Sequence, residues 1–265
     1  MKNILVPIGT SSTSHETLQY AVDFAEAFSA HIYVMDVFNV SAKTGSLANI
    51  SEKIAEKSKE QLKGVIAKVN AKNNAIKIAS YNGDIISGIK HINTEIGIDL
   101  IVISPRSNDI KEGLYLGKTS GRIIKQTDIP SLIIPKGVTF SPYTSALTAF
   151  KSGILKRNRI LKPLKKIQNK FNTKINLLLV KTPGYSDADL KINTDLVDIS
   201  SQLTITENAT TYLGVIEHFQ AQQPDLLCVF RRKRGFFKKL WEKNTIPKSE
   251  FYAPIPVLVL SVSRD

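Results

Sequence analysis

The segment Gly113-Leu-Tyr-Leu-Gly117-Lys118-Thr119 carries the residue types that bind phosphate in proteins: glycines, a lysine and a hydroxyl side chain. A nucleotide-binding P-loop needs four residues between its two glycines, and it follows a strand directly. Here only three residues separate Gly113 from Gly117. We therefore do not interpret the segment as a P-loop, although Gly117, Lys118 and Thr119 stay candidates for contact with an anion.

Other reactive side chains are sparse. None of the four histidines has a carboxylate, a cysteine or a second histidine at a metal-binding spacing. The single cysteine, Cys228, lies in an apolar run, which is typical of an inert thiol in a protein core. A Gly-x-Ser-x-Gly nucleophile motif does not occur in the sequence. We expect no catalytic residue and no metal site, and we predict that the protein is not an enzyme.

The composition is that of an ordinary globular protein, but the charge is uneven. The 265 residues are 42% hydrophobic and carry a formal net charge of +13. Residues 1–138 hold 16 Lys+Arg and 13 Asp+Glu (+3), whereas residues 139–265 hold 20 and 10 (+10). The surplus gathers in two clusters, one in residues 156–170 and one in residues 231–243, the latter interleaved with Phe236, Phe237 and Trp241. Such a face binds nucleic acid through charge and stacking, but these aromatic residues also have the spacing of a helix packed on a sheet, which we favour.

The N-terminal stretch MKNILVPIGTSS is too short and too broken by Pro7 and Gly9 to be a signal peptide. No run approaches the ~20 apolar residues that a membrane span needs. We expect a cytoplasmic protein without a membrane partner.

The hydrophobic pattern alternates between strand and helix periods along the first half. Strands are predicted at residues 4–6, 32–35, 76–80, 100–103 and 132–134, with helical stripes at residues 18–28, 50–69, 85–96 and 117–126. Thr13 and Glu16 have the spacing of a capping box at the start of the first helix. Strand–helix alternation of this kind implies a mostly parallel sheet.

The second half repeats the ending of the first. Asp99-Leu-Ile-Val-Ile103 has a counterpart in residues 225–229, and Ile129-Pro-Ser-Leu-Ile133 has one in residues 255–259, both at an offset of 126 residues. His31-Ile-Tyr-Val34 instead resembles residues 174–177, at an offset of 143. We infer an internal duplication whose second copy lacks about 17 residues, so its second helix must be short, around residues 188–199. Residues 136–143 are the predicted linker.

With these elements in order, the chain resembles the universal stress protein family in its tandem form. The residues that carry the resemblance are the opening Asn3-Ile-Leu-Val-Pro7, the helix that follows it, and the two repeated runs above. The implied fold class is α/β, adenine nucleotide alpha hydrolase-like. Two tandem domains, residues 1–138 and 139–265, would each be an open five-stranded, mostly parallel sheet flanked by helices. The family's fifth strands mediate dimer contacts, which implies self-association or, in a tandem chain, the same pairing made internally.

Many members of that family bind ATP or AMP, which implies the same ligands for the first domain here. The family's phosphate loop, Gly-x2-Gly-x9-Gly-Ser/Thr, falls on Ser104, Ser107, Gly117 and Lys118, so one glycine of three is kept. The acid of the family's Pro-x-Asp, which contacts ribose, is replaced by Gly9. The candidate nucleotide-binding residues are Pro7, Gly9, Val37, Ile103, Ser104, Ser107, Gly117, Lys118 and Thr119. In the second copy the loop reads Phe230-Arg-Arg-Lys233, where we expect no family-like nucleotide site.

Three functions stay open at this stage. The chain is a regulatory binding protein with a nucleotide in its first domain, a nucleotide-free interaction module built as an internal dimer, or an anion or nucleic-acid binder that uses its basic second domain. We favour the first and disfavour nucleic acid.

Overall fold

A computed structural model of the chain describes residues 1–9, 11–38, 48–105, 113–155, 158–231 and 244–261. The first half contains β1 (Asn3–Pro7), α1 (Ser14–Phe28), β2 (His31–Phe38), α2 (Ala48–Ile66), β3 (Ile76–Asn82), α3 (Ile85–Ile96), β4 (Leu100–Ile103), β5 (Leu114–Leu116), α4 (Lys118–Gln126) and β6 (Ser131–Ile133). Every strand and helix predicted for this half is present, with ends that differ by a few residues.

The second half begins at β7 (Ser145–Phe150), after a connection that contains the predicted linker. It continues with η1 (Asn158–Leu161), α5 (Lys162–Phe171), β8 (Lys174–Lys181), η2 (Asp187–Leu190), α6 (Thr194–Asp198), β9 (Gln202–Glu207), α7 (Thr211–Gln222), β10 (Leu226–Arg231), β11 (Ile246–Pro247) and β12 (Val257–Ser261). The short η2 and α6 stand where the sequence predicts a shortened helix.

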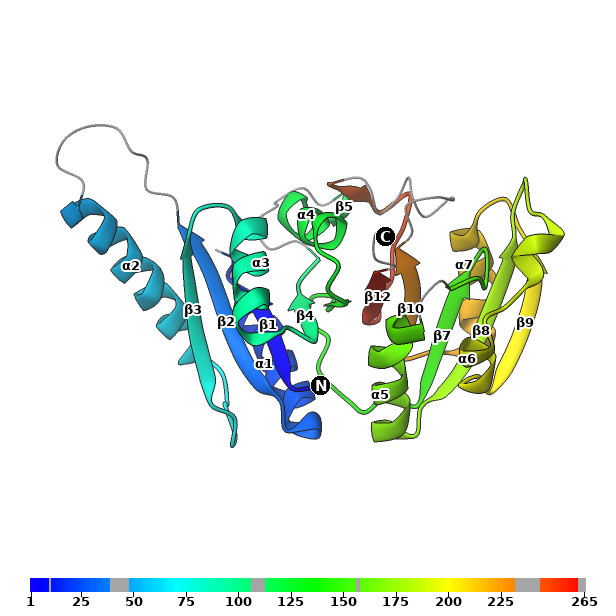
Figure 1. Cartoon of the computed structure of the whole chain (residues 1–265), viewed down its shortest axis with the longest axis horizontal. Helices are drawn as coiled ribbons and strands as arrows, with labels where there is room; N and C mark the ends of the chain where they lie inside the picture. The colour runs from blue at the N-terminus through cyan, green and yellow to red at the C-terminus, as the bar shows by residue number, and fades with distance from the viewer. Residues whose placement is uncertain (10, 39–47, 106–112, 156–157, 232–243, 262–265) are drawn as a thin grey trace.

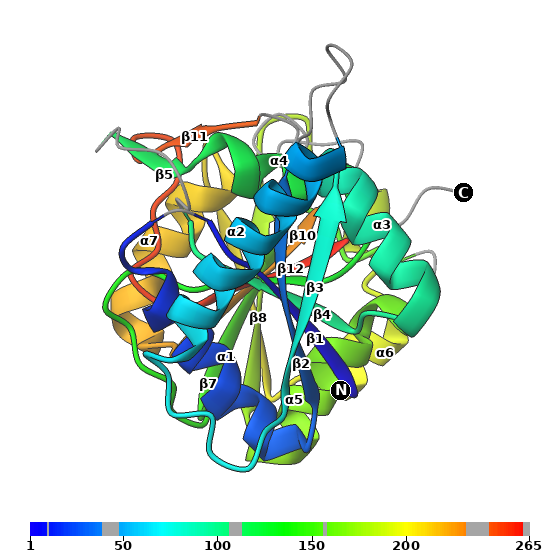
Figure 2. The same ribbon diagram turned by 90° about the vertical axis from the view of Figure 1, so that its left-hand side faces the viewer.

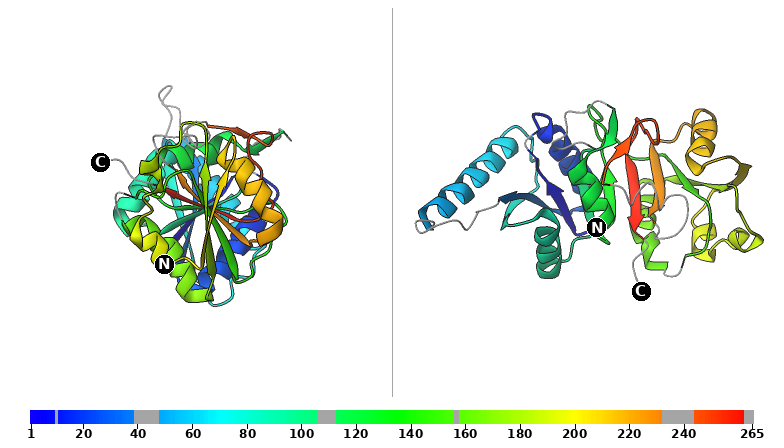
Figure 3. Two further views of the ribbon diagram at one scale, coloured as in Figure 1. Left: turned by 90° about the vertical axis from the view of Figure 1, so that its right-hand side faces the viewer. Right: turned by 90° about the horizontal axis from the view of Figure 1, so that it is seen from above.

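Ten strands form one continuous sheet, in the order β3-β2-β1-β4-β6-β12-β10-β7-β8-β9 (Figure 1). Pairing is parallel within each half, whereas β6 and β12 pair antiparallel at the centre. Leu132 lies opposite Leu258 there, and these are the equivalent residues at the offset of 126. The fifth strand of each half therefore pairs with its own counterpart about a pseudo-two-fold axis, and the halves lie end to end (Figure 3, right).

The duplication extends to single hydrogen bonds. Asp99 precedes β4 and accepts from the backbone amides of Lys2 and Asn3, at 2.6 and 3.2 Å. Asp225 precedes β10 and accepts from the amides of Thr144 and Ser145, at 2.8 and 3.1 Å. In both halves a carboxylate thus fixes the start of the neighbouring central strand.

Both faces of the sheet are covered, as the continuous apolar strands require. Ile4 and Val6 point into one core cluster and Leu5 into the other, because side chains alternate along a strand. Helices α1, α2, α5 and α6 cover the first face, and α3, α4 and α7 cover the second; Figure 2 shows α1 and α2 opposite α3.

The connection between the halves is packed into the core. Phe140 contacts the ring of Phe24 on α1 edge-on, at a centroid distance of 5.7 Å. The Tyr143 hydroxyl lies 2.6 Å from the Tyr20 hydroxyl, in a buried hydrogen bond. The predicted linker is therefore part of the joint between the two halves.

Two expectations about helix starts need correction. Thr13 does precede α1, but its side chain makes no capping hydrogen bond, so the predicted capping box is wrong. The Glu16 carboxylate instead accepts from the backbone amide of Gly137, at 3.2 Å. The second half has β11 at the offset equivalent of α4, and β11 pairs antiparallel with β5 of the first half. The repeated offset of 126 residues is therefore not accompanied by the same secondary structure at α4.

Among the described residues, no helix is both long and apolar enough to cross a membrane.

Candidate functional site

A cavity of about 320 Å³ lies at the carboxyl ends of β1, β2 and β4, and we refer to it as the strand-end cavity. Its lining includes six of the predicted site residues: Pro7, Gly9, Val37, Ile103, Ser104 and Thr119. The rest of its lining is Ile8, Asp36, Gly83, Asp84, Ile85, Ser120, Arg122 and Ile123. Open parallel sheets bind ligands at this edge, because loops leave the strands there in both directions.

The helix α4 closes one side of this cavity. Gly117 is its N-cap, and its amide donates to the Pro105 carbonyl at 2.8 Å. The Ser120 hydroxyl donates to the Ser104 carbonyl at 2.8 Å, which ties the first turn of α4 to the end of β4. Gly117 is buried and Lys118 exposed; both flank the cavity without lining it. Ser107 lies outside the described residues.

The sequence analysis missed three charged side chains of the strand-end cavity: Asp36, Asp84 and Arg122. The Arg122 guanidinium donates to Asp84 at 2.6 Å. Burial works to raise the pKa of the Asp84 carboxyl, but hydrogen bonds from Arg122 and from the Ile86 amide outweigh it and hold this pKa below its usual value. An aspartate directly before a helical stripe is an N-cap signal, so Asp84 could have been noticed in the sequence.

The Asp36 carboxylate also lies at the end of β2. It accepts a hydrogen bond from the Ser58 hydroxyl of α2, at 2.7 Å. The cavity therefore holds two carboxylates and one guanidinium beside its hydroxyl and apolar groups. This mixed charge suits a ligand with hydrogen-bond donors as well as an anionic group.

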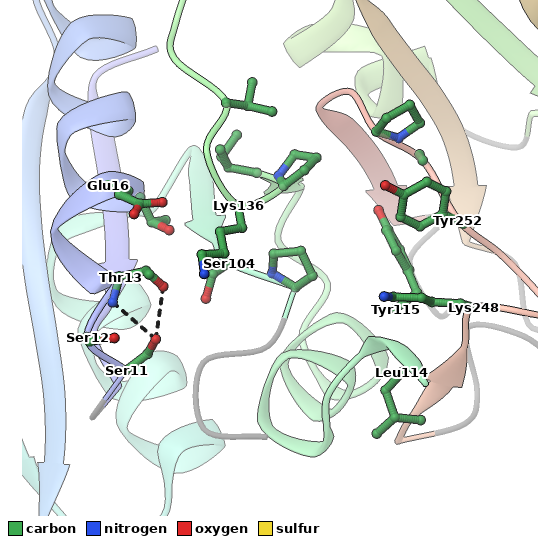
Figure 4. Close-up of a pocket in the computed structure, with 17 residues that line it drawn as sticks. Ser11, Ser12, Thr13, Glu16, Ser104, Leu114, Tyr115, Lys136, Lys248 and Tyr252 are labelled. Carbon is green, nitrogen blue, oxygen red and sulfur yellow. Dashed lines mark hydrogen bonds between the residues drawn. The ribbon is translucent and has the colours of Figure 1, made fainter. Parts of the chain in front are cut away.

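A larger hollow of about 680 Å³ lies where the two halves meet, and we refer to it as the interhalf cleft. One wall is the start of α1, with Ser11, Ser12, Thr13 and Glu16, and the opposite wall carries Tyr115, Lys248 and Tyr252 (Figure 4). Lys136 and Ser104 lie between these walls. Only Ser104 is shared with the strand-end cavity.

At the corresponding edge of the second half, the described residues differ from those of the first half. Phe230 replaces Ser104 at the offset of 126, is buried, and packs against Phe150 with ring centroids 6.3 Å apart. The equivalent of Gly117 is residue 243, which lies outside the described residues, as do residues 232–242.

Arg231 corrects our interpretation of the basic cluster in residues 231–243. It is only 5% exposed, so it does not contribute to a basic face of the second half. Its guanidinium donates to the carbonyls of Lys125 and Thr127, at 2.8 and 3.0 Å, and to Asp128 at 3.0 Å. Arg231 therefore binds the carboxyl end of α4 in the first half, where carbonyl groups lack helical partners.

The other side chains that could be reactive are the Cys228 thiol and possible metal ligands. Cys228 is fully buried in β10, and burial raises the pKa of its thiol to about 12, so it is a poor nucleophile. Among the described residues, no group of three or more His, Cys, Asp or Glu side chains could hold a metal ion.

Comparison with known proteins now adds to this geometry. The model of the universal stress protein family matches residues 1–135. Universal stress protein MJ0531 of Methanocaldococcus jannaschii is 30% identical over 142 residues, which are 51% of this chain and 82% of that protein.

Solved structures match the whole chain. The structure of a universal stress protein from Archaeoglobus fulgidus superposes with a TM-score of 0.70 at 19% identity, covering 99% of this chain and 97% of that one. A putative universal stress protein from Pseudomonas aeruginosa gives a TM-score of 0.60 at 14% identity, with coverages of 98% and 93%. At these identities the likeness concerns the fold.

Proposed function

Since the chain belongs to the universal stress protein family, we propose that it is a regulatory binding protein that holds an adenine nucleotide, ATP or AMP, in the strand-end cavity. The observation that carries this proposal is that six residues, predicted from four separate stretches of sequence, line one cavity. The proposal assigns no catalytic residue to the chain. We also propose that the chain consists of two domains, residues 1–138 and 139–265.

In the proposed complex, the base and ribose lie near Val37 and Gly9, at the ends of β2 and β1. The phosphates lie toward Thr119 and the start of α4, where amide groups and the helix dipole favour an anion. Lys118 and Arg122 add positive charge on the same helix. Occupancy would bridge the end of β4 and α4, and so alter the surface that a partner protein meets.

A second candidate is a nucleotide-free interaction module, and the Asp36 and Asp84 carboxylates favour it. Both line the cavity, and each disfavours a nearby phosphate through like-charge repulsion. In this alternative the duplicated halves serve to build the continuous sheet alone.

Calorimetric titration of the purified protein with ATP and with AMP separates the two candidates. The first predicts heat of binding that disappears in Thr119→Trp, because the indole would fill the cavity beside α4. Absence of heat and of any thermal shift at millimolar nucleotide would support the interaction module.

A gain of affinity is a sharper test of the same site. The variant Gly9→Asp restores the acid that contacts ribose in the family, and one added hydrogen bond is worth ~1 kcal/mol, so we expect roughly fivefold tighter AMP binding. Lys151→Asp is the control, because Lys151 follows β7 as Gly9 follows β1. Equal effects of the two variants would contradict the placement of the ribose.

A further inference from the structure

We propose that the interhalf cleft is a second ligand site, separate from the strand-end cavity, that takes a small phosphorylated molecule with free hydroxyl groups, such as a sugar phosphate. At about 680 Å³ the cleft has room for a molecule of this class. The argument rests on an unpartnered buried hydroxyl, on the placement of charge, and on the contribution of both halves.

The Tyr115 hydroxyl is the first observation. Tyr115 is 3% exposed and lines the cleft, and its hydroxyl has no hydrogen-bond partner among the described residues. A buried polar group without a partner is energetically unfavourable, so such groups call for an explanation. In Figure 4 its side chain and that of Tyr252, which is half-exposed, project from the same wall toward the cleft. A turn of the Tyr252 side chain would open the Tyr115 hydroxyl to a ligand.

Charge is the second observation. The side chains of Lys136 and Lys248 line the cleft from different halves, and neither has an ion-pair partner among the described residues. The start of α1 forms the facing wall, and Thr13 leaves its first turn without a side-chain cap. Two ammonium groups and a 15-residue helix that begins there favour a doubly charged anion such as a phosphate monoester.

The remaining polar groups select against a bare anion. Ser12 offers a hydroxyl group, the Ser11 and Thr13 hydroxyls already hydrogen-bond to each other at 2.9 Å, and the Glu16 carboxylate can accept hydrogen bonds but not donate them. Glu16 already accepts from the Gly137 amide and has further acceptor capacity. A ligand whose hydroxyl donors are separate from its phosphate can satisfy Glu16 while the phosphate lies at the lysines, whereas inorganic phosphate has no separate hydroxyl groups to place against Glu16.

The site depends on the tandem arrangement. Lys248, Tyr252, Ala253 and Pro254 come from the second half, and β11 holds Lys248 in place by pairing with β5. The Lys248 amide also donates to the Gly113 carbonyl, at 2.8 Å. One half alone would lack a wall and one of the two cations.

The binding test uses ribose 5-phosphate and inorganic phosphate as probes, titrated by calorimetry into the full chain. We expect ribose 5-phosphate to bind more tightly than phosphate, and to lose at least tenfold in affinity in Lys136→Glu and in Lys248→Glu. Lys57→Glu, an exposed lysine on α2, is the matched charge control and should change affinity less than twofold. No heat with ribose 5-phosphate at millimolar concentration overturns the proposal.

Thr119→Trp distinguishes the two cavities. This variant blocks the strand-end cavity and should leave ribose 5-phosphate binding unchanged. If Thr119→Trp abolishes binding while the two lysine variants retain it, the probe occupies the strand-end cavity and the proposal is wrong. The outcome is independent of whether ATP or AMP binds.

Tyr115→Phe gives a readout that a structural role would not produce. Removing an unpartnered hydroxyl should raise the melting temperature of the free protein or leave it unchanged, yet weaken ribose 5-phosphate binding several-fold. A lower melting temperature with unchanged affinity would show that the hydroxyl serves the fold alone, and would overturn its assignment to the ligand.

Discussion

The ends of β4 and β10 occupy equivalent places in the two halves, but the first borders cavities and the second is buried. After β4, Ser104 borders both cavities, and Thr119 and Ser120 at the start of α4 line the strand-end cavity. After Val229 in β10, the equivalent residue Phe230 is buried against Phe150. In the first half, the carboxyl end of this strand is open to cavities. In the second half, aromatic rings fill the same place.

The segments that follow these strands also differ between the halves: the first forms a helix and the second an extended strand. Gly121 lies inside α4, and its equivalent at the offset of 126 is Pro247, which lies in β11. Proline inside a helix removes a hydrogen bond and clashes with the preceding turn, so the second copy cannot repeat α4 there. The extended segment instead pairs with β5, and the Asn244 backbone packs directly on Gly121. The second copy has thus replaced a helix like α4 with a contact between the halves.

Arg231 gives the strongest test of this exchange. Arg231→Met would leave the carbonyls of Lys125 and Thr127 without their donor and remove the partner of Asp128, so we expect a loss of about 3 kcal/mol in the free energy of unfolding. Arg122→Met is the control from the first half, because its pair with Asp84 is partly exposed and worth under about 1 kcal/mol. Urea unfolding measures both, and equal losses would mean that Arg231 does not join the halves.

Gly121 tests the same contact from the first half. A Cβ there would overlap the Asn244 carbonyl, so Gly121→Ala should destabilise the protein by about 2 kcal/mol through overpacking. Gly64→Ala in α2 meets open space and should instead stabilise it by about 0.5 kcal/mol, since alanine favours a helix. Thermal unfolding of both variants measures whether each one lowers or raises the stability of the protein. A neutral Gly121→Ala would contradict the close approach of the second copy to α4.

The smallest expected effect compares Asp99 with Asp225. Both fix a strand start, but Asp99 also has the Lys166 ammonium of the other half at 3.5 Å. Burial opposes ionisation of Asp99, yet the Lys2 and Asn3 amides and Lys166 outweigh it and hold its pKa below its usual value. Ionised Asp99 therefore stabilises the fold at neutral pH, and this contribution falls as the pH drops below about 4.

We expect Asp99→Asn to lower stability at pH 7 by up to about 1 kcal/mol more than Asp225→Asn does, because within the described part of the chain only Asp99 has an ion-pair partner. The excess should be smaller at pH 3 than at pH 7, because the unfolded chain takes up a proton at this carboxyl below about pH 4 and the lowered pKa of folded Asp99 then contributes less. Urea unfolding at the two pH values measures it. If the additional loss of stability in Asp99→Asn does not change with pH, it arises from hydrogen bonding alone and not from the ion pair.

Much of the fold could be predicted because it depends on local pattern. Apolar runs such as Leu100–Ile103 are buried on both faces of the sheet, so every residue is apolar and the strand is easy to recognise. The repeated offset of 126 gave the equivalent strands, and Leu132 opposite Leu258 confirms it at the centre of the sheet. The shortened segment of the second copy was also predicted in the right place.

The errors came from contacts between distant residues. The Thr13 and Glu16 spacing indicated a capping box, but Glu16 hydrogen-bonds to Gly137, which is 121 residues away. Arg231 reads as part of a basic loop, but its partners lie more than 100 residues earlier in the chain. Asp36 and Arg122 belong to no recognised motif, and only the fold brings them to the strand-end cavity.

The sequence by itself determined the family, the parallel strands, the duplication and six of the residues that line the strand-end cavity. The strands follow from short-range periodicity and the duplication from the repeated offset of 126 residues, whereas the cavity residues follow from the resemblance to the family's motifs; a linear sequence retains all three. Only the tertiary structure decided that Arg231 is buried, that β11 replaces a helix by pairing with β5, and that Tyr115, Lys136 and Lys248 face one cleft. These features depend on how the two halves pack against each other. The pairing of β6 with β12 at the centre of the sheet decides which distant residues come into contact, and the neighbours in the sequence do not.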